Sequence, residues 1–128
     1  MMTLSTRIPL ALSVLAVAGC GLISAPNCTL TFDPAVEVVV QDSASGAMIA
    51  SGAQLIAREG TYADSMSLSA NRTDLDSKSL SAANERAGTY TVTVRKPGYR
   101  EWTRSNVQVE QEVCHVRTVR LTALMQRF

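Results

Sequence analysis

The clearest pattern along the chain is a regular alternation of apolar and polar residues from Gly88 to Arg95. Tyr90, Val92 and Val94 alternate with threonines, and a period of two is typical of a β-strand with one buried and one exposed face. The next four residues, Lys96-Pro97-Gly98-Tyr99, favour a type II turn, because proline presets φ at the second position and glycine accepts the positive φ of the third. The segment therefore predicts a β-hairpin.

Shorter stretches of the same pattern lie on both sides of this hairpin. Strands are expected near 36–40, 53–57, 62–68, 78–83 and 100–109, and a last strand from Cys114 to Leu124. About seven short strands at this spacing predict an all-β fold, a single antiparallel β-sandwich of the Ig-like or prealbumin-like kind. The strand at 78–83 is expected to be a polar edge strand, because Leu75 and Leu80 are the only large apolar residues of segment 69–87.

The first 19 residues have the pattern of a helical signal peptide. Arg7 precedes an apolar stretch that is too short to span a bilayer as a mature helix. The stretch ends in Leu15-Ala16-Val17-Ala18-Gly19-Cys20, which resembles the lipobox of bacterial lipoproteins. The resemblance implies cleavage before Cys20 and acylation, including palmitate, of its thiol and its new amine. The alternatives are an ordinary signal peptide or a buried helix.

Acylation at Cys20 would anchor the protein to the cell envelope. Three acyl chains make release from a membrane negligible. Residues 20–27 then form a tether, of which the seven residues after Cys20 reach at most about 25 Å, and residues 28–128 form the domain. Gly21 follows the cysteine where some Gram-negative lipoproteins have aspartate, so in such a host we expect the periplasmic face of the outer membrane.

The remaining two cysteines, Cys28 and Cys114, are expected to form a disulfide, because an exported chain meets an oxidising compartment. Closing a loop of this length is worth roughly 4–5 kcal/mol in the chain-entropy account. The alternative is a pair of free buried thiols. Together with the lone histidine, His115, the two cysteines supply at most three zinc ligands without the usual paired spacing, so no metal and no cofactor is expected.

Charge is unevenly distributed along the mature chain. Four basic and eight acidic residues lie between Cys28 and Val94, whereas seven basic and three acidic residues follow from Arg95 onward. A basic face of this kind attracts acidic polymers or lipopolysaccharide, although a solvated strand surface is the commoner explanation. Export makes nucleic acid the least expected partner.

The run from Gly88 to Tyr99 resembles the hallmark of carboxypeptidase regulatory-like domains, which belong to the prealbumin-like β-sandwiches. The likeness covers roughly Ala35 to Leu124 and implies the fold without a specific activity. No nucleophile or orienting group accompanies His115 in a known motif, so it is interpreted as an ordinary strand residue beside the disulfide. Asp74 and Asp76 are interpreted as solvated loop carboxylates and not as calcium ligands.

The leading hypothesis is a non-enzymatic, lipid-anchored module that binds an envelope protein or a glycan. Tyr99, Arg100 and Trp102 are the candidate contact residues, although a single tryptophan in an alternating strand more often packs into the core. One alternative is a small envelope enzyme or enzyme inhibitor that uses the polar segment 69–87. Another is a purely structural spacer.

Overall fold

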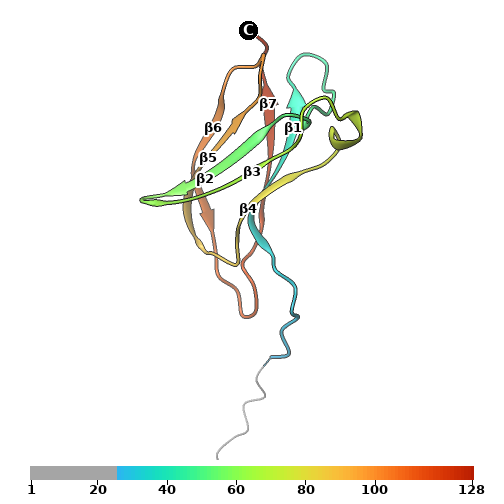
Figure 1. Ribbon diagram of the computed structural model, residues 1–128. Helices are drawn as coiled ribbons and strands as arrows, with labels where there is room; N and C mark the ends of the chain where they lie inside the picture. Colours follow the sequence, from blue (N-terminus) through green and yellow to red (C-terminus); the bar gives the residue numbers. More distant parts are fainter. Residues whose placement is uncertain (1–25) are drawn as a thin grey trace, which may run out of the picture.

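The structure is a computed structural model that describes residues 26–128, so the predicted signal peptide and Cys20 lie outside the described residues. This part of the chain forms seven strands and one short 3₁₀ helix (Figure 1). They are β1 (Pro34–Asp42), β2 (Gln54–Glu59), β3 (Tyr62–Ser67), η1 (Thr73–Leu75), β4 (Leu80–Asn84), β5 (Gly88–Arg95), β6 (Trp102–Val109) and β7 (Val119–Met125). Among the described residues, no helix is both long enough and apolar enough to cross a membrane.

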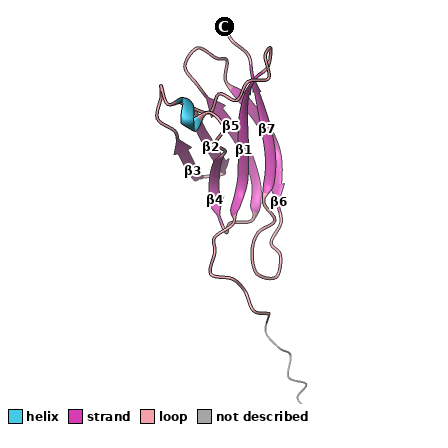
Figure 2. Cartoon of the chain, turned by 90° about the vertical axis from the view of Figure 1, so that its right-hand side faces the viewer, coloured by secondary structure: helices cyan, strands magenta, loops and turns pink. Residues whose placement is uncertain are grey.

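The strands form two sheets that pack face to face (Figure 2). One sheet has the order β4-β1-β7 and the other the order β3-β2-β5-β6. This arrangement confirms the predicted all-β sandwich and is compatible with an Ig-like fold. One pairing differs from the prediction, because β1 and β7 run parallel from Val36 beside Val119 to Asp42 beside Met125. After β6 the chain crosses to the other sheet, and β7 is added there beside β1 in the same direction instead of pairing with β6.

The alternating residues meet between the two sheets. On β1, the side chains of Val36, Val38 and Val40 are fully buried, and they belong to the same hydrophobic core as the buried Val92 and Val94 of β5. Burying a valine side chain stabilises a fold by roughly 1.5–3 kcal/mol relative to leaving it exposed. The alternation that predicted the strands is therefore also what holds the sheets together.

The predicted hairpin around Pro97 is present. β5 and β6 pair antiparallel, the Tyr99 amide donates to the Lys96 carbonyl at 3.1 Å, and Gly98 has a φ of 84°. That positive φ is the conformation that a type II turn requires at its third position and that glycine adopts without strain.

Tyr90 closes the corner at which β4 leads into β5. Its side chain is buried, and its hydroxyl donates to the carbonyl of Arg86 four residues upstream at 2.7 Å. The same hydroxyl accepts from the Arg86 guanidinium at 2.9 Å, and the ring meets Tyr62 edge-on. Ig-like sandwiches use a comparable tyrosine corner at the start of a core strand.

Strand β4 lies at the edge of its sheet, as predicted, but its polar character was wrongly predicted. Leu80 and Ala83 are fully buried, because β4 pairs with β1 and turns these side chains into the core. The buried apolar residues of β4 are thus one large side chain, Leu80, and two small ones, Ala82 and Ala83.

The last strand begins at Val119, later than the predicted start at Cys114. Residues 111–116 form a small reversal in which Gln111 pairs with Val116 and the Glu112 amide donates to the His115 carbonyl at 3.0 Å. His115 therefore lies in the β6–β7 loop and not in a strand, which corrects the sequence interpretation.

The expected disulfide between Cys28 and Cys114 is present, with 5.2 Å between the two Cα atoms. It joins the segment that leads into β1 to the β6–β7 loop. This end of the sandwich, formed by residues 26–33, the turn 84–88 and the loop 110–118, is called the N-terminal end below. The opposite end, formed by the turn 42–47, by residues 95–104 and by residues 126–128, is called the distal end (Figure 1).

Replacement of the buried edge-strand leucine tests the corrected role of β4. We expect Leu80→Ala to lower the free energy of unfolding by about 2–4 kcal/mol, because it leaves a cavity next to β1. Asn84→Ala, at the exposed end of the same strand, is the matched control and should change it by less than about 0.5 kcal/mol. Urea unfolding curves measure both. Equal small effects would mean that β4 is not part of the core.

Candidate functional site

The three candidate contact residues lie together at the distal end. Tyr99 and Arg100 belong to the turn after β5, and Trp102 is the first residue of β6. The last residues of the chain pair with this turn, since the Arg100 amide donates to the Gln126 carbonyl at 2.8 Å and the Phe128 amide to the Gly98 carbonyl at 3.3 Å. The structure thus adds Phe128 to the group, which local sequence patterns did not indicate.

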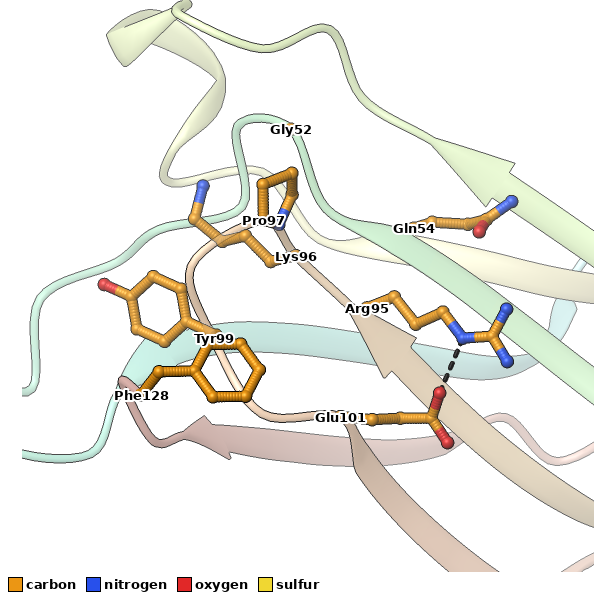
Figure 3. A pocket seen from close by; sticks show the side chains of 8 residues that line it. All are labelled: Gly52, Gln54, Arg95, Lys96, Pro97, Tyr99, Glu101 and Phe128. Carbon is orange, nitrogen blue, oxygen red and sulfur yellow. Dashed lines mark hydrogen bonds and ion pairs between the residues drawn. The ribbon is translucent and has the colours of Figure 1, made fainter.

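A shallow hollow of about 440 Å³ opens beside the turn (Figure 3). Its walls are formed by Gly52, Gln54, Arg95, Lys96, Pro97, Tyr99, Glu101 and Phe128. Arg95 and Glu101 form an ion pair at 2.6 Å on one side, while the Lys96 ammonium donates to the Ser51 carbonyl. The hollow therefore has both an aromatic wall and fixed charges.

Aromatic rings and arginines alternate around the distal end. The Arg100 guanidinium lies 5.8 Å from the centre of the Phe128 ring, and that of Arg104 lies 5.6 Å from the centre of the Trp102 ring. Phe128 is 84% exposed, whereas Trp102 is half-buried and packs against the core. Trp102 therefore belongs to the edge of the core and still presents part of its ring at the surface.

The distal end is basic. Its charged residues are Arg95, Lys96, Arg100, Arg104 and Arg127 on the positive side and Asp42 and Glu101 on the negative side. Because both carboxylates already pair with arginines within this group, the excess positive charge of the group is free to face a ligand.

Asp42 holds the distal end together, although the sequence indicated only a turn at this position. Its side chain is 2% exposed and accepts hydrogen bonds from the amides of Ala44 and Ser45, from the Tyr99 hydroxyl and from Arg127, all at 2.9–3.0 Å. These donors, above all the Ser45 amide and Arg127, hold the pKa of the Asp42 carboxyl far below its usual range. Three segments of the chain thus meet at one carboxylate.

The same network acts on Tyr99. Burial and the hydrogen bond to the Asp42 carboxylate both raise the pKa of its phenol, so the hydroxyl stays protonated and donates. The ring of Tyr99 also lies 5.5 Å from the Arg127 guanidinium and 6.0 Å from the Lys96 ammonium. Tyr99 is therefore a positioning residue whose hydroxyl is already engaged, and only its ring lines the hollow.

Taken together, the distal group offers cations, aromatic faces and a shallow hollow. Aromatic faces and arginines bind planar, sugar-like or anionic groups, and their mutual contacts keep the side chains in place before a ligand arrives. This arrangement supports recognition of an anionic partner.

The other residues singled out from the sequence have structural contacts. Asp74 forms an exposed ion pair with Arg72 at 2.7 Å, in agreement with a solvated loop carboxylate. Asp76 is half-buried, and its carboxylate accepts from the Ser51 amide at 3.0 Å. The interpretation of Asp76 as a solvated loop carboxylate was therefore only partly correct. His115 lies at the N-terminal end, far along the sandwich from the candidate contacts.

The Asp42 network gives a pH-dependent prediction. A carboxyl group whose pKa is lowered by folding stabilises the fold above its unfolded pKa of about 3.9, and this contribution is lost as pH falls through its folded pKa. We therefore expect Asp42→Asn to lower the melting temperature by a constant amount between pH 7 and pH 5. The difference from the unmodified protein should shrink below about pH 4. A difference that stays constant down to pH 2 in thermal scans would contradict the account.

No protein-family model matches the chain, and a search of curated proteins finds no match either.

Proposed function

We propose that this chain is a bacterial lipoprotein anchored to the cell envelope through acylated Cys20. In this proposal its sandwich is a carboxypeptidase regulatory-like domain, and it acts without catalysis by binding an anionic envelope partner at the distal end. The partner is an acidic glycan or the acidic surface of an envelope protein. The observation that carries the proposal is that the candidate contact residues lie at the end of the sandwich opposite the end at which the chain enters from the lipobox.

This separation has a simple geometric consequence. The residues between Cys20 and Cys28 reach at most about 25 Å, so a lipid at Cys20 would keep the N-terminal end close to the bilayer. Because β1, β5, β6 and β7 all run along the length of the sandwich, the distal end would then point away from the membrane. Tyr99, Arg100, Trp102 and Phe128 would be presented to the periplasm.

Charge supports the same orientation. The distal end is basic, whereas the N-terminal end carries four acidic residues, Asp33, Glu85, Glu110 and Glu112, against two arginines, Arg86 and Arg117. An anionic partner is attracted by the first end and repelled by the second. Binding is therefore expected at the end that faces away from the lipid.

The contacts within segment 69–87 favour the binding module over an enzyme or inhibitor built on this segment. The Ser51 hydroxyl accepts a hydrogen bond from the Arg72 amide at 3.0 Å, and the Ser51 amide donates to the Asp76 carboxylate. The second half of the segment is strand β4, which pairs with β1. These interactions give the segment a role in holding the sandwich together.

Chemical crosslinking in intact cells tests the binding end. We expect the double variant Arg100→Ala and Trp102→Ala to lower the yield of the crosslinked partner by about 30-fold or more, because arginine and tryptophan anchors typically contribute about 1–2 kcal/mol each when buried in an interface. Arg58→Ala, an exposed arginine on β2, is the matched control and should leave the yield unchanged.

The identity of the crosslinked species separates the two kinds of partner. A product that yields crosslinked peptides of a second sequence by mass spectrometry indicates an envelope protein, whereas a product whose mass falls to that of this chain after glycan digestion indicates a polysaccharide. Equal yields from the double variant, the control and the unmodified protein would contradict a binding site at the distal end, provided that immunoblots show equal amounts of all three.

A further inference from the structure

A second group of polar side chains lies at the N-terminal end, where three segments far apart in the sequence converge. Asp33 precedes β1, Glu85 lies in the turn between β4 and β5, and His115 lies in the β6–β7 loop. One ligand atom from each residue, the two carboxylate oxygens and a ring nitrogen, can be chosen so that all three lie within 4.8 Å of one another. All three residues are half-buried.

Each of the three residues is held in place by contacts of its own. The Asp33 amide donates to the Glu85 carboxylate at 2.7 Å, and the Glu85 amide donates back to the Asp33 carbonyl at 2.9 Å. His115 follows Cys114, which the disulfide fixes to Cys28. The Glu85 carboxylate is therefore held by an amide hydrogen bond, while a backbone hydrogen bond holds the main chains of Asp33 and Glu85 together and the disulfide fixes the residue next to His115.

The charges at this end leave two carboxylates for one histidine. The neighbouring Arg86 pairs with Glu59 at 2.9 Å and stacks over the Tyr62 ring at 3.8 Å, while Arg117 pairs with Glu110 and Glu112. Hydrogen bonds from the Asp33 amide and from His115 lower the pKa of the Glu85 carboxyl, so that it is ionised at neutral pH. A divalent cation would balance the two carboxylates.

We propose that Asp33, Glu85 and His115 form a binding site for a divalent transition-metal ion of the zinc class. One imidazole nitrogen and two carboxylate oxygens are ligands that zinc accepts, and three protein ligands leave the fourth position to water or to a partner. The ion would tie together the segment before β1, the β4–β5 turn and the β6–β7 loop.

The histidine can present the required lone pair through a change of tautomer. Its Nδ1 atom lies 2.6 Å from the Glu85 carboxylate, and its Nε2 atom lies 2.9 Å from the Thr29 hydroxyl. A hydroxyl both donates and accepts, so Thr29 can pair with Nε2 whether or not that nitrogen carries the proton. Metal binding at Nδ1 would place the ring proton on Nε2, which would then donate to the Thr29 hydroxyl. A metal-bound histidine usually donates its other ring N–H to such an acceptor.

The ion needs a rearrangement of the ligand atoms, which now lie within 4.8 Å of one another, and a path from solvent. Zinc binds nitrogen and carboxylate oxygen at about 2.0–2.2 Å, so neighbouring ligand atoms lie about 3.3–3.5 Å apart and the contact between His115 and Glu85 must widen by somewhat under 1 Å. His115 lines two hollows, one of about 720 Å³ beside Val113 and one of about 440 Å³ beside Phe32. Solvent ions can therefore reach the ring from either side.

The sequence did not indicate this site because its ligands are widely separated. Asp33 and Glu85 are 52 residues apart, and Glu85 and His115 are 30 residues apart. The zinc ligands that the sequence offered were the two cysteines together with His115, and the structure joins the cysteines in the disulfide.

Zinc titration of the full chain tests the proposal independently of the distal end. The processed protein, purified in detergent with its disulfide intact and treated with a chelator, is titrated with Zn²⁺ in competition with a chromophoric chelator. We expect one zinc ion per chain at micromolar concentrations. We also expect zinc to raise the melting temperature by several degrees, because an ion that binds only the folded state stabilises it.

The variants His115→Gln, Glu85→Gln and Asp33→Asn should each weaken zinc binding at least tenfold and abolish the rise in melting temperature. The amides are close in shape to the acids, and the side-chain carbonyl introduced by Glu85→Gln would still accept from the Asp33 amide, so folding should be retained. Glu112→Gln removes a carboxylate from the same loop outside the group and serves as the matched control, with binding unchanged. Failure of the unmodified protein to bind zinc, or equal binding by His115→Gln, would overturn the proposal.

Discussion

The disulfide between Cys28 and Cys114 is the constraint on which the arrangement of the N-terminal end depends. It closes a loop with a sequence separation of 86 and places the segment before β1 next to the loop before β7. Because β1 and β7 are parallel neighbours, both strands must start at the same end of the sandwich. The covalent bond fixes these two starting points together, and it lowers the entropy of the unfolded chain by an amount worth roughly 4–5 kcal/mol in the chain-entropy account.

The two ends of the sandwich differ in how they are held and in what they present. At the N-terminal end, the disulfide and the hydrogen bonds of the Glu85 carboxylate, to the Asp33 amide and to the His115 ring, bring acidic residues close to His115. At the distal end, the buried carboxylate of Asp42 gathers two turns and the end of the chain, and arginines and aromatic rings surround it. If the protein is anchored as proposed, the acidic end would face the membrane and the basic end would face away from it.

Local patterns in the sequence predicted the elements but not the contacts between distant segments. The alternation of Tyr90, Val92 and Val94 correctly indicated β5, and the turn residues around Pro97 correctly indicated the hairpin, because both depend on neighbouring residues only. The burial of Leu80 was missed because it depends on the pairing of β4 with β1. In that pairing Leu80 lies beside Val38, which is 42 residues away along the chain. The same holds for the parallel pairing of β1 with β7.

The candidate sites show the same limit. Tyr99, Arg100 and Trp102 could be grouped from the sequence because they follow one turn, whereas Phe128 joins them only through its pairing with Gly98. Asp42 could be recognised as a turn residue from the small residues after it. Its bonds to Tyr99 and Arg127, 57 and 85 residues away, required the folded structure.

The most direct test of the proposed anchored protein is the intact mass of the chain extracted from native membranes, measured with and without reduction and thiol alkylation. The account predicts the mass of residues 20–128 plus acyl chains, with two alkylatable thiols that appear only after reduction. A mass without acyl chains would contradict the anchor and the orientation derived from it, and free thiols before reduction would contradict the disulfide.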